Sequence, residues 1–563
     1  MLASVGKWLT SSPPQRAVTG FHSHADTPLI RLHGHDCLRV RDLFEGVQIV
    51  GGTGSGKSSG SGKAIAMAML QAGWGGLVLC AKPDEADRWV GYLRASGRAA
   101  HLIRVHPGSP YRINFPDYEL HRPDGGGRET FNLVALMEVM MDATATAQGS
   151  AAGGESAAFW ILSRRELLAN AIEPLVAATG RFRLDELMQM VASAPTSREE
   201  AFSDDWKARS FCYRILRASF EAPVGGKLAM HELQAAADYW FSTFAGLDPK
   251  TRSNIVATLT SAISPFLRGV LHDSFCTQTT VIPELTHQGA VIVWDFPVKV
   301  WGAAAVVATQ MIKYQWQKAT ERRAIDSCTR PVFLFADECQ FFLSDYDAEF
   351  QSTARSAMAA TIYITQNLPT YYSRLRARDA KATADSLLGN FQTKIFHANT
   401  DPTTNQYAAD LIGRSLQARR SKNWSASENS QSSYTDSENW GTQSGSSTGR
   451  NRGTNFGVSI STTDEGRNSV SFSGGSNSGS QSGGSRSRSK GGGYSVGESQ
   501  SYGSSDGGGW SEQMDYTIQP VVFASALRKG GQADGGLVDG IVVQGGRRFQ
   551  TTGAHWLPCT FRQ

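Results

Sequence analysis

Gly51-Gly52-Thr53-Gly54-Ser55-Gly56-Lys57-Ser58 is the stretch that decides the fold of this chain. The apolar run just before it, Val47–Val50, predicts a short buried strand. The periodic residues 64–72 just after it, closed by Gly73, predict a helix. Glycines between a strand and a helix allow successive backbone N–H groups and the helix N-terminus to point at one anion. The stretch therefore predicts a phosphate-binding loop, and the flanking strand and helix argue against a mere Gly/Ser turn.

The expected ligands of this loop are ATP and Mg²⁺. Lys57 is expected to reach the β- and γ-phosphates, and the Ser58 hydroxyl is expected to ligate Mg²⁺. The other candidate nucleotide-binding residues are the rest of the loop and the serine that follows it: Gly51, Gly52, Thr53, Gly54, Ser55, Gly56 and Ser59.

A second signature is the apolar run Val332–Ala336, which ends in Asp337 and Glu338. The run predicts a buried strand with two carboxylates at its carboxyl end, beside the phosphate-binding loop if the two strands are neighbours. Asp337 is expected to hold a Mg²⁺-bound water, and Glu338 to orient and deprotonate the attacking water. An apolar run ending in Asp-Glu is a weak signal alone and becomes a good one beside a phosphate-binding loop.

Two further candidates surround the next predicted strand, residues 361–365. Gln366 follows that strand, where an amide can hydrogen-bond the γ-phosphate or the attacking water. Arg355 precedes it on a predicted helix and is the candidate for an arginine finger that acts across a subunit boundary. A solvated arginine on a helix face is an equally good interpretation of Arg355, and Arg374 and Arg376 are the alternatives for the finger.

Composition limits the class of protein. The 563 residues allow two or three domains, and a formal net charge of +4 permits nucleic-acid binding without requiring it. Seven scattered cysteines indicate a reduced, cytoplasmic chain. We expect no signal peptide and no transmembrane segment, so recruitment to the inner membrane would need partners. The segment His33–Cys37 contains candidate metal ligands, but a hairpin without a second ligand cluster is expected there.

The order of the predicted elements indicates an α/β fold with a parallel sheet, interrupted by helices. Strands are also expected at Leu77–Cys80, followed by the polar residues 82–85, and at His101–Val105. The predicted parts are an amino-terminal β-hairpin segment (1–45), the first part of the nucleotide-binding domain (46–129), an inserted all-α domain (130–275), the second part (276–420), a disordered loop (421–512) and returning strands (513–563). The loop is predicted from its Ser, Gly and Asn content, which cannot bury a core.

These motifs resemble those of the conjugative coupling proteins of type IV secretion systems, the TraG/TraD group, within the FtsK/HerA class of ring-forming ATPases. The resemblance rests on residues 51–58, 250–255, 333–338, 361–369, 389–395 and 546–553. It implies a RecA-like P-loop domain with an inserted all-α domain. It also implies a homohexamer that uses ATP to move DNA, or a DNA–relaxase complex, to a secretion channel. In this family a glutamine follows the sensor strand and an arginine finger follows the second motif, which matches Gln366 and, less closely, Arg355. Most members carry amino-terminal transmembrane helices, and we expect none here.

Three functions remain open on the sequence. The first is the DNA-translocating ATPase that contacts a relaxase or other secretion substrate and type IV secretion components. The second is a soluble HerA-like ATPase in DNA processing or defence. The third is a cargo receptor of a secretion system in which hydrolysis is incidental. A small-molecule kinase ranks below these because Glu338 suits water activation better than phosphoryl transfer to a substrate.

Overall fold

The computed structural model describes residues 20–127, 129–148, 155–221, 229–375, 380–436, 444–462, 468–486 and 494–563. Residues up to Asn405 together with Val521–Gln563 form one compact unit, and Gln406–Pro520 form another. Each unit is described by itself.

A nine-stranded sheet is the centre of the first unit, and its strand order is β15-β14-β9-β3-β8-β7-β4-β6-β5. The neighbours from β9 to β5 are all parallel, whereas β14 is antiparallel to both β9 and β15. The predicted α/β fold with a parallel sheet is therefore confirmed. The strands are β3 (Val47–Val50), β4 (Gly75–Leu79), β5 (Leu102–Val105), β6 (Val291–Trp294), β7 (Val332–Ala336), β8 (Ala359–Thr365), β9 (Thr393–Phe396), β14 (Leu537–Gln544) and β15 (Trp556–Arg562).

Helices cover both faces of this sheet, which is why the central strands are apolar throughout. Every residue of β7 and β8 is buried. On one face Trp89 stacks on Phe333, while on the other Trp294 donates a hydrogen bond to Thr309. The helices around the sheet are α2 (Val40–Phe44), η1 (Ser58–Gly62), α3 (Lys63–Gln71), α4 (Glu85–Ala95), α5 (Phe115–Leu120), α15 (Val298–Arg322), α16 (Tyr346–Thr353), α17 (Pro369–Tyr372), α18 (Ala380–Gly389) and α20 (Pro520–Ser525). Helix α19 (Pro402–Ile412) begins in this unit and ends in the other.

The strand order shows whether the two strands that carry the motifs are neighbours. Strand β7, which carries the two carboxylates, is not the neighbour of β3, which precedes the phosphate-binding loop, because β8 lies between them. The residue that follows β8 is Gln366. The glutamine therefore lies between the loop and the carboxylates at the carboxyl edge of the sheet.

A β-hairpin precedes the nucleotide-binding part, formed by β1 (Pro28–His33) and β2 (Asp36–Arg39). The Asp36 carboxylate accepts hydrogen bonds from the backbone N–H groups of Gln550 and Thr551, at 2.7 and 2.9 Å. Asp36 thus joins the hairpin to the segment before β15. Among the residues that the structure describes, no cluster of three or more His, Cys, Asp or Glu could hold a metal ion.

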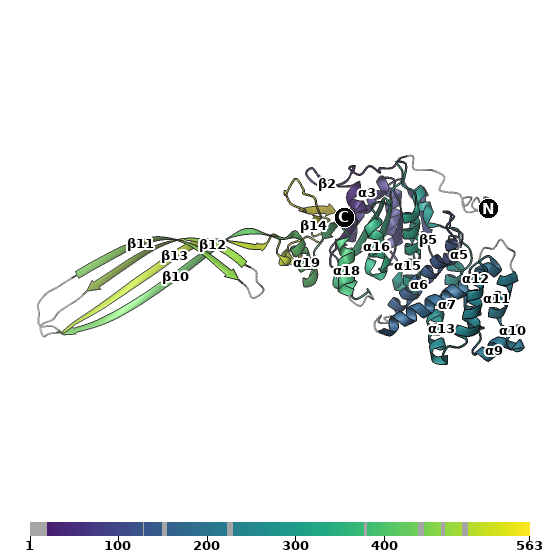
Figure 1. The fold of residues 1–563 in the computed structure, drawn as a ribbon. Coiled ribbons are helices and arrows are strands. Elements are labelled where there is room, and N and C mark those ends of the chain that lie inside the picture. The colour runs from purple at the N-terminus through teal and green to yellow at the C-terminus, as the bar shows by residue number, and fades with distance from the viewer. Residues whose placement is uncertain are drawn as a thin grey trace. The chain divides into compact units, whose positions relative to one another are not determined.

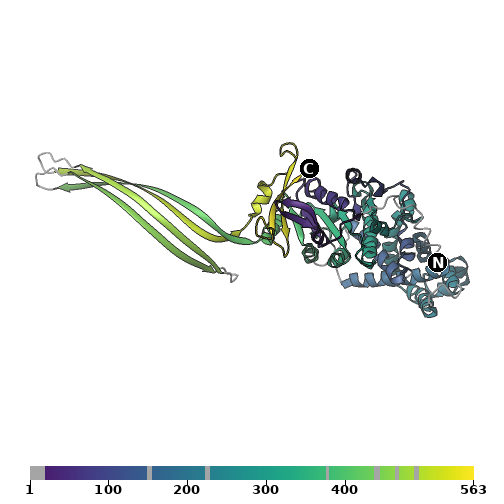
Figure 2. The ribbon, with the colours of Figure 1, turned by 90° about the horizontal axis from the view of Figure 1, so that it is seen from above.

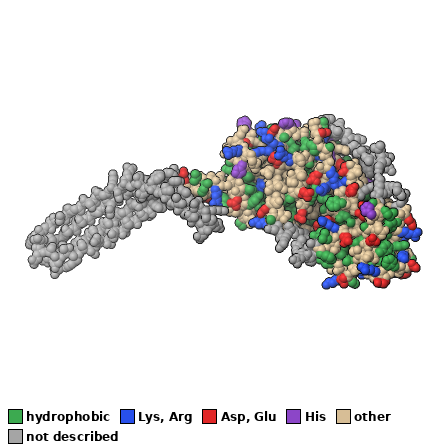
Figure 3. Space-filling view, in the orientation of Figure 1, with side chains coloured by type: hydrophobic (Ala, Val, Ile, Leu, Met, Phe, Trp, Pro, Cys, Tyr) green, Lys and Arg blue, Asp and Glu red, His purple; other side chains and the backbone are tan. Residues whose placement is uncertain are grey.

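The described residues 130–148, 155–221 and 229–275 are mainly helical, and they lie beyond the β5 edge of the sheet, whereas β14 and β15 form the opposite edge (Figures 1 and 2). The helices are α6 (Thr130–Ala147), α7 (Glu155–Thr179), α8 (Leu184–Ala192), α9 (Arg198–Phe202), α10 (Asp204–Arg209), α11 (Phe211–Glu221), α12 (Met230–Asp238), η3 (Tyr239–Phe244), α13 (Pro249–Ile263), η4 (Ser264–Leu267) and α14 (Gly269–Phe275). Several large apolar side chains here are exposed, among them Phe131, Leu162 and Phe202. Figure 3 shows hydrophobic side chains gathered over this helical part.

No single helix in the described ranges is long and apolar enough to cross a bilayer. One bent pair, Pro249–Leu267 with Gly269–Phe275, meets the length and composition criteria jointly across a 90° bend.

The Ser/Gly-rich region is not the disordered loop that its composition predicts. It forms a four-stranded antiparallel sheet in the order β10-β13-β12-β11, with β10 (Arg414–Asp436), β11 (Ser444–Thr462), β12 (Asn468–Arg486) and β13 (Tyr494–Tyr516). The prediction considered only the side chains, which offer little apolar surface to bury. The ladder is made by main-chain N–H and C=O groups, which Ser and Gly supply as well as any other residue.

Candidate nucleotide-binding site

The phosphate-binding loop needs its glycines for two different reasons. Gly54 and Gly56 have φ angles of +72° and +78°, a left-handed region that strains side-chain-bearing residues. A Cβ on Gly56 would also lie 2.4 Å from Cγ2 of Val538 in β14, and a Cβ on Gly51 would lie 2.5 Å from Oγ of Ser55. The loop is therefore closely packed against its own side chains and against the carboxyl-terminal strands.

The helix after the loop begins with the π-helical turn η1 and continues as α3. The backbone N–H of Gly62 donates to the Lys57 carbonyl at 2.9 Å, the i to i+5 bond that defines the wider turn. N–H groups of a first helical turn have no partner within the helix, so they are available to an anion. The loop and helix thus have the geometry that phosphate binding requires.

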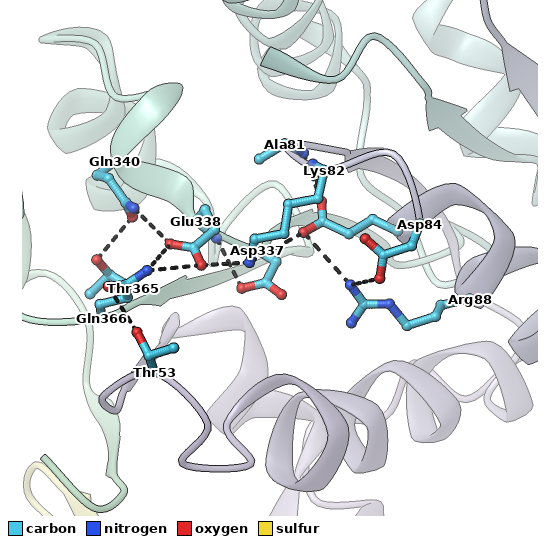
Figure 4. A network of polar contacts seen from close by, with 11 residues as sticks. Thr53, Ala81, Lys82, Asp84, Arg88, Asp337, Glu338, Gln340, Thr365 and Gln366 are labelled. Carbon is cyan, nitrogen blue, oxygen red and sulfur yellow. Dashed lines mark hydrogen bonds and ion pairs between the residues drawn. The ribbon is translucent and has the colours of Figure 1, made fainter. Parts of the chain in front are cut away.

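Asp337 and Glu338 follow β7 and are both buried. Glu338 has a φ angle of +51°, which few residues other than glycine adopt, so the backbone is strained at this turn. Its carboxylate accepts hydrogen bonds from the Gln340 amide at 2.7 Å and from the Lys82 ammonium at 2.6 Å (Figure 4). The backbone N–H of Glu338 donates to Asp337 Oδ1 at 2.9 Å. A carboxylate held in this way is well oriented to act on a water molecule.

Lys57 and the two carboxylates lie within electrostatic range of one another. Burial lowers the pKa of Lys57, and the negative charges of Glu338 and Asp337 partly oppose that effect. Burial raises the pKa of Glu338, but hydrogen bonds from Lys82 and Gln340 and the charge of Lys57 outweigh it and leave that pKa below its ordinary value. The structure therefore brings the loop lysine and the carboxylate pair to one place.

Gln366 connects the loop to Glu338. Its Oε1 accepts a hydrogen bond from the Thr53 hydroxyl at 3.4 Å, and its Nε2 donates to both carboxylate oxygens of Glu338 at 3.3 Å. The Asn399 amide donates to the Gln366 carbonyl at 2.8 Å. Gln366 thus links the phosphate-binding loop to Glu338 through direct side-chain hydrogen bonds.

Ser58 and Asp337 are the residues that fit a magnesium ion. Both line one small cavity, together with Glu85 and Arg88 of α4. A hydroxyl and a carboxylate are the oxygen donors that Mg²⁺ prefers, and Mg²⁺ usually retains waters and substrate phosphates as its other ligands. Burial, and then the neighbouring Asp337 charge, raise the pKa of Glu85 to about 8.

The structure does not place Arg355 with these residues. Its side chain is 73% exposed and lies 3.9 Å from Oε1 of Glu45, which precedes β3. The phosphate-binding loop follows the other end of that strand, so Arg355 is remote from the loop of its own chain. Arg374 lies over the Phe341 ring at 4.9 Å, and Arg376 is outside the described residues.

Sequence reasoning assigned no role to Lys82, Glu85 or Gln340. Lys82 and Glu85 follow the buried strand β4, just as Asp337 and Glu338 follow β7. This shared position after a buried strand is the sequence signal that could have identified them as site residues. Gln340 accepts a hydrogen bond from the Thr365 hydroxyl at 3.0 Å while it donates to Glu338. No pattern in the sequence distinguishes that glutamine from an ordinary polar residue.

His397 fixes the helix after the loop to β14. Its Nδ1 lies 2.8 Å from the Asp539 carbonyl, which leaves Nε2 as the acceptor for the Ser61 hydroxyl at 2.7 Å. Burial lowers the pKa of His397 to about 4. Since the unfolded pKa of histidine is about 6.5, the unfolded chain binds more protons between these two values, and stability falls as pH falls through that window.

We expect His397→Gln to reduce this acid sensitivity. The full shift corresponds to about 3 kcal/mol of unfolding free energy, reached near pH 4. Denaturant unfolding of both proteins at pH 7 and pH 5 measures the difference. An unchanged pH dependence in the variant would show that His397 does not titrate on unfolding.

A family model described as the TraM recognition site of TraD and TraG matches residues 331–453, which begin just before β7. This match confirms the resemblance to the TraG/TraD coupling proteins. No curated protein matches the chain.

Solved structures with a similar arrangement include the plasmid coupling protein TrwB. Its complex with the non-hydrolysable GTP analogue GDPNP is 14% identical, covers 70% of this chain and 80% of that chain, and has a TM-score of 0.45. Its complex with ADP and Mg²⁺ is 14% identical with the same coverage and a TM-score of 0.44. VirB4 of Thermoanaerobacter pseudethanolicus is 12% identical, covers 71% of this chain and 95% of that chain, and has a TM-score of 0.39.

Proposed function

We propose that this chain is an ATP-hydrolysing motor that moves DNA, or DNA bound to a relaxase, to a type IV secretion channel. The observation that carries the proposal is the convergence of Lys57, Asp337, Glu338 and Gln366 at the carboxyl edge of one parallel sheet. The match to a segment of TraD and TraG supports the conjugative setting over DNA processing or defence.

In this function each side chain has a separate task. The loop N–H groups and Lys57 would hold the phosphates, and Ser58 and Asp337 would hold Mg²⁺. Bound Mg²⁺ supplies positive charge to the β- and γ-phosphates. Glu338 accepts the proton of the attacking water, and Gln366 transmits the loss of the γ-phosphate from the loop to Glu338.

The motor is proposed to be a homohexamer in which Arg355 of one subunit completes the site of the next. The exposure of Arg355 and its distance from its own loop support this role. Loops that move on phosphate release would then grip DNA through its phosphates, so binding should weaken as salt rises.

Hydrolysis measured with and without single- and double-stranded DNA tests the proposal. DNA should stimulate ATP turnover, and added salt should remove that stimulation. Turnover that ignores DNA, or no turnover, would favour the cargo receptor instead. Binding of a labelled relaxase–DNA complex separates the two functions further, because a receptor binds its cargo without needing hydrolysis.

Arg355→Ala should retain nucleotide binding and ring assembly while losing hydrolysis by about 10³-fold, the effect typical of a missing arginine finger. Sedimentation and nucleotide-binding measurements check the first part, and turnover of the assembled ring checks the second. Normal turnover in this variant would exclude Arg355, and Arg374→Ala and Arg376→Ala would then be the variants to compare.

A further inference from the structure

Lys82 forms a hydrogen-bonded ion pair with one oxygen of Glu338, the proposed catalytic carboxylate. Lys82 comes three residues after the end of β4, the strand next to β7, and its ammonium lies 2.6 Å from Oε1 of Glu338. The two side chains differ in exposure, at 38% for Lys82 and 3% for Glu338. Figure 4 shows the lysine reaching across to the carboxylate. The pair therefore joins a buried acceptor to a cation that has access to solvent.

The hydrogen bonds to the two Glu338 oxygens differ in strength, and Oε1 is the oxygen that accepts from a charged donor. Gln340 donates to Oε2 at 2.7 Å, and Gln366 donates to both oxygens at the longer distance of 3.3 Å. A charged donor at 2.6 Å forms a stronger hydrogen bond than a neutral amide or a water. An attacking water must displace Lys82 before Glu338 can accept its proton through Oε1.

The charges around Lys82 would favour movement of its ammonium from Glu338 to a bound phosphate. Its ammonium is within electrostatic range of the Lys57 ammonium, which is the expected ligand of the β- and γ-phosphates. Glu85 is its only other ion-pair partner among the described residues, and that carboxylate lies 4.0 Å away. A triphosphate at Lys57 would bring several negative charges into the same space, where they compete with Glu338 for Lys82.

We propose that Lys82 is a positioning residue that restrains Glu338 through this ion pair, and that the terminal phosphate of a nucleotide held by Lys57 draws Lys82 away and frees Oε1 for the attacking water. The inference rests on the proposed function, because it assumes that Lys57 binds a nucleoside triphosphate. In this proposal Lys82 lets Glu338 accept a proton from water only when a terminal phosphate is bound.

The test compares the affinities of the full chain for ADPNP and for ADP, each with Mg²⁺, and needs no hydrolysis. Lys82→Met should weaken ADPNP binding about tenfold, a typical coupling between two linked contacts, and change ADP binding little. Lys82→Arg keeps the charge and should restore most of the ADPNP affinity. Lys299→Met, which removes an exposed lysine in α15, is the control.

A second arm separates the ion pair from a simple phosphate contact. Glu338→Gln should tighten ADPNP binding in the native background, because Lys82 no longer has to leave a carboxylate, and should have no such effect beside Lys82→Met. Equal effects of Glu338→Gln in both backgrounds would overturn the proposal. Wild-type protein that binds neither nucleotide would instead contradict the proposed function, so the two failures are distinguishable.

Discussion

Glu338→Gln is expected to bind ATP and fail to hydrolyse it. The amide keeps the size of the carboxylate and one acceptor oxygen, which can still accept from Gln340 and Gln366, while its NH2 group replaces the oxygen that accepts from Lys82. It cannot accept a proton from water, and loss of a general base typically costs about 10²–10⁴-fold in rate. Single-turnover hydrolysis and equilibrium nucleotide binding measure the two effects separately.

The matched control for Glu338→Gln is Asp84→Asn. Asp84 has a 71% exposed side chain and pairs with Arg88 at 3.1 Å on the surface of α4. This variant makes the same chemical change outside the carboxylate pair, and its turnover should equal that of the wild type. Hydrolysis by Glu338→Gln at the wild-type rate would remove Glu338 from the mechanism.

Lys57→Ala is expected to lose both nucleotide binding and hydrolysis. Lys57 is buried beside Asp337 and Glu338, and its cation is the charge expected to meet the phosphates. Removing it leaves two carboxylates facing an incoming triphosphate, so the local charge becomes repulsive. Titration with a fluorescent ATP analogue should show at least a tenfold loss of affinity, a difference of about 1.4 kcal/mol.

Lys63→Ala, six positions after Lys57 at the start of α3, is the control for Lys57→Ala. Both variants remove a lysine near the start of the helix, so a general effect on helix stability would appear in both. Wild-type affinity in Lys57→Ala, or an equal loss in Lys63→Ala, would contradict the assigned role. DNA stimulation should persist in Lys63→Ala.

The sequence was sufficient to predict the elements that meet at the site. Lys57, Asp337 and Gln366 each follow an apolar strand, and the carboxyl ends of parallel strands meet at one edge of a sheet. Their convergence is a consequence of that rule. The side-chain pattern within each strand could not show that β8 separates β3 from β7, because strand order depends on how the connecting helices cross the sheet.

The parts that sequence reasoning missed depend on contacts between distant segments. The ion pair of Lys82 with Glu338 exists because β4 is the neighbour of β7, which local patterns do not reveal. The sheet over Arg414–Tyr516 is held by main-chain pairing, so its Ser/Gly composition gave the wrong prediction. Arg355 stays a prediction, because a finger that acts across a subunit boundary is expected to lie away from the site of its own chain.

The contact between Gly56 and Val538 has a consequence for the order of events during synthesis. The loop is made long before β14, yet Val538 packs against Gly56 and Gly60, and the Asp539 carbonyl holds His397 against Ser61. In a nascent chain that lacks β14, Val538 is not yet present to pack against the phosphate-binding loop. We expect a chain that ends before β14 to bind nucleotide more weakly than the full chain, because Val538 and the Asp539 carbonyl no longer support the loop and its helix.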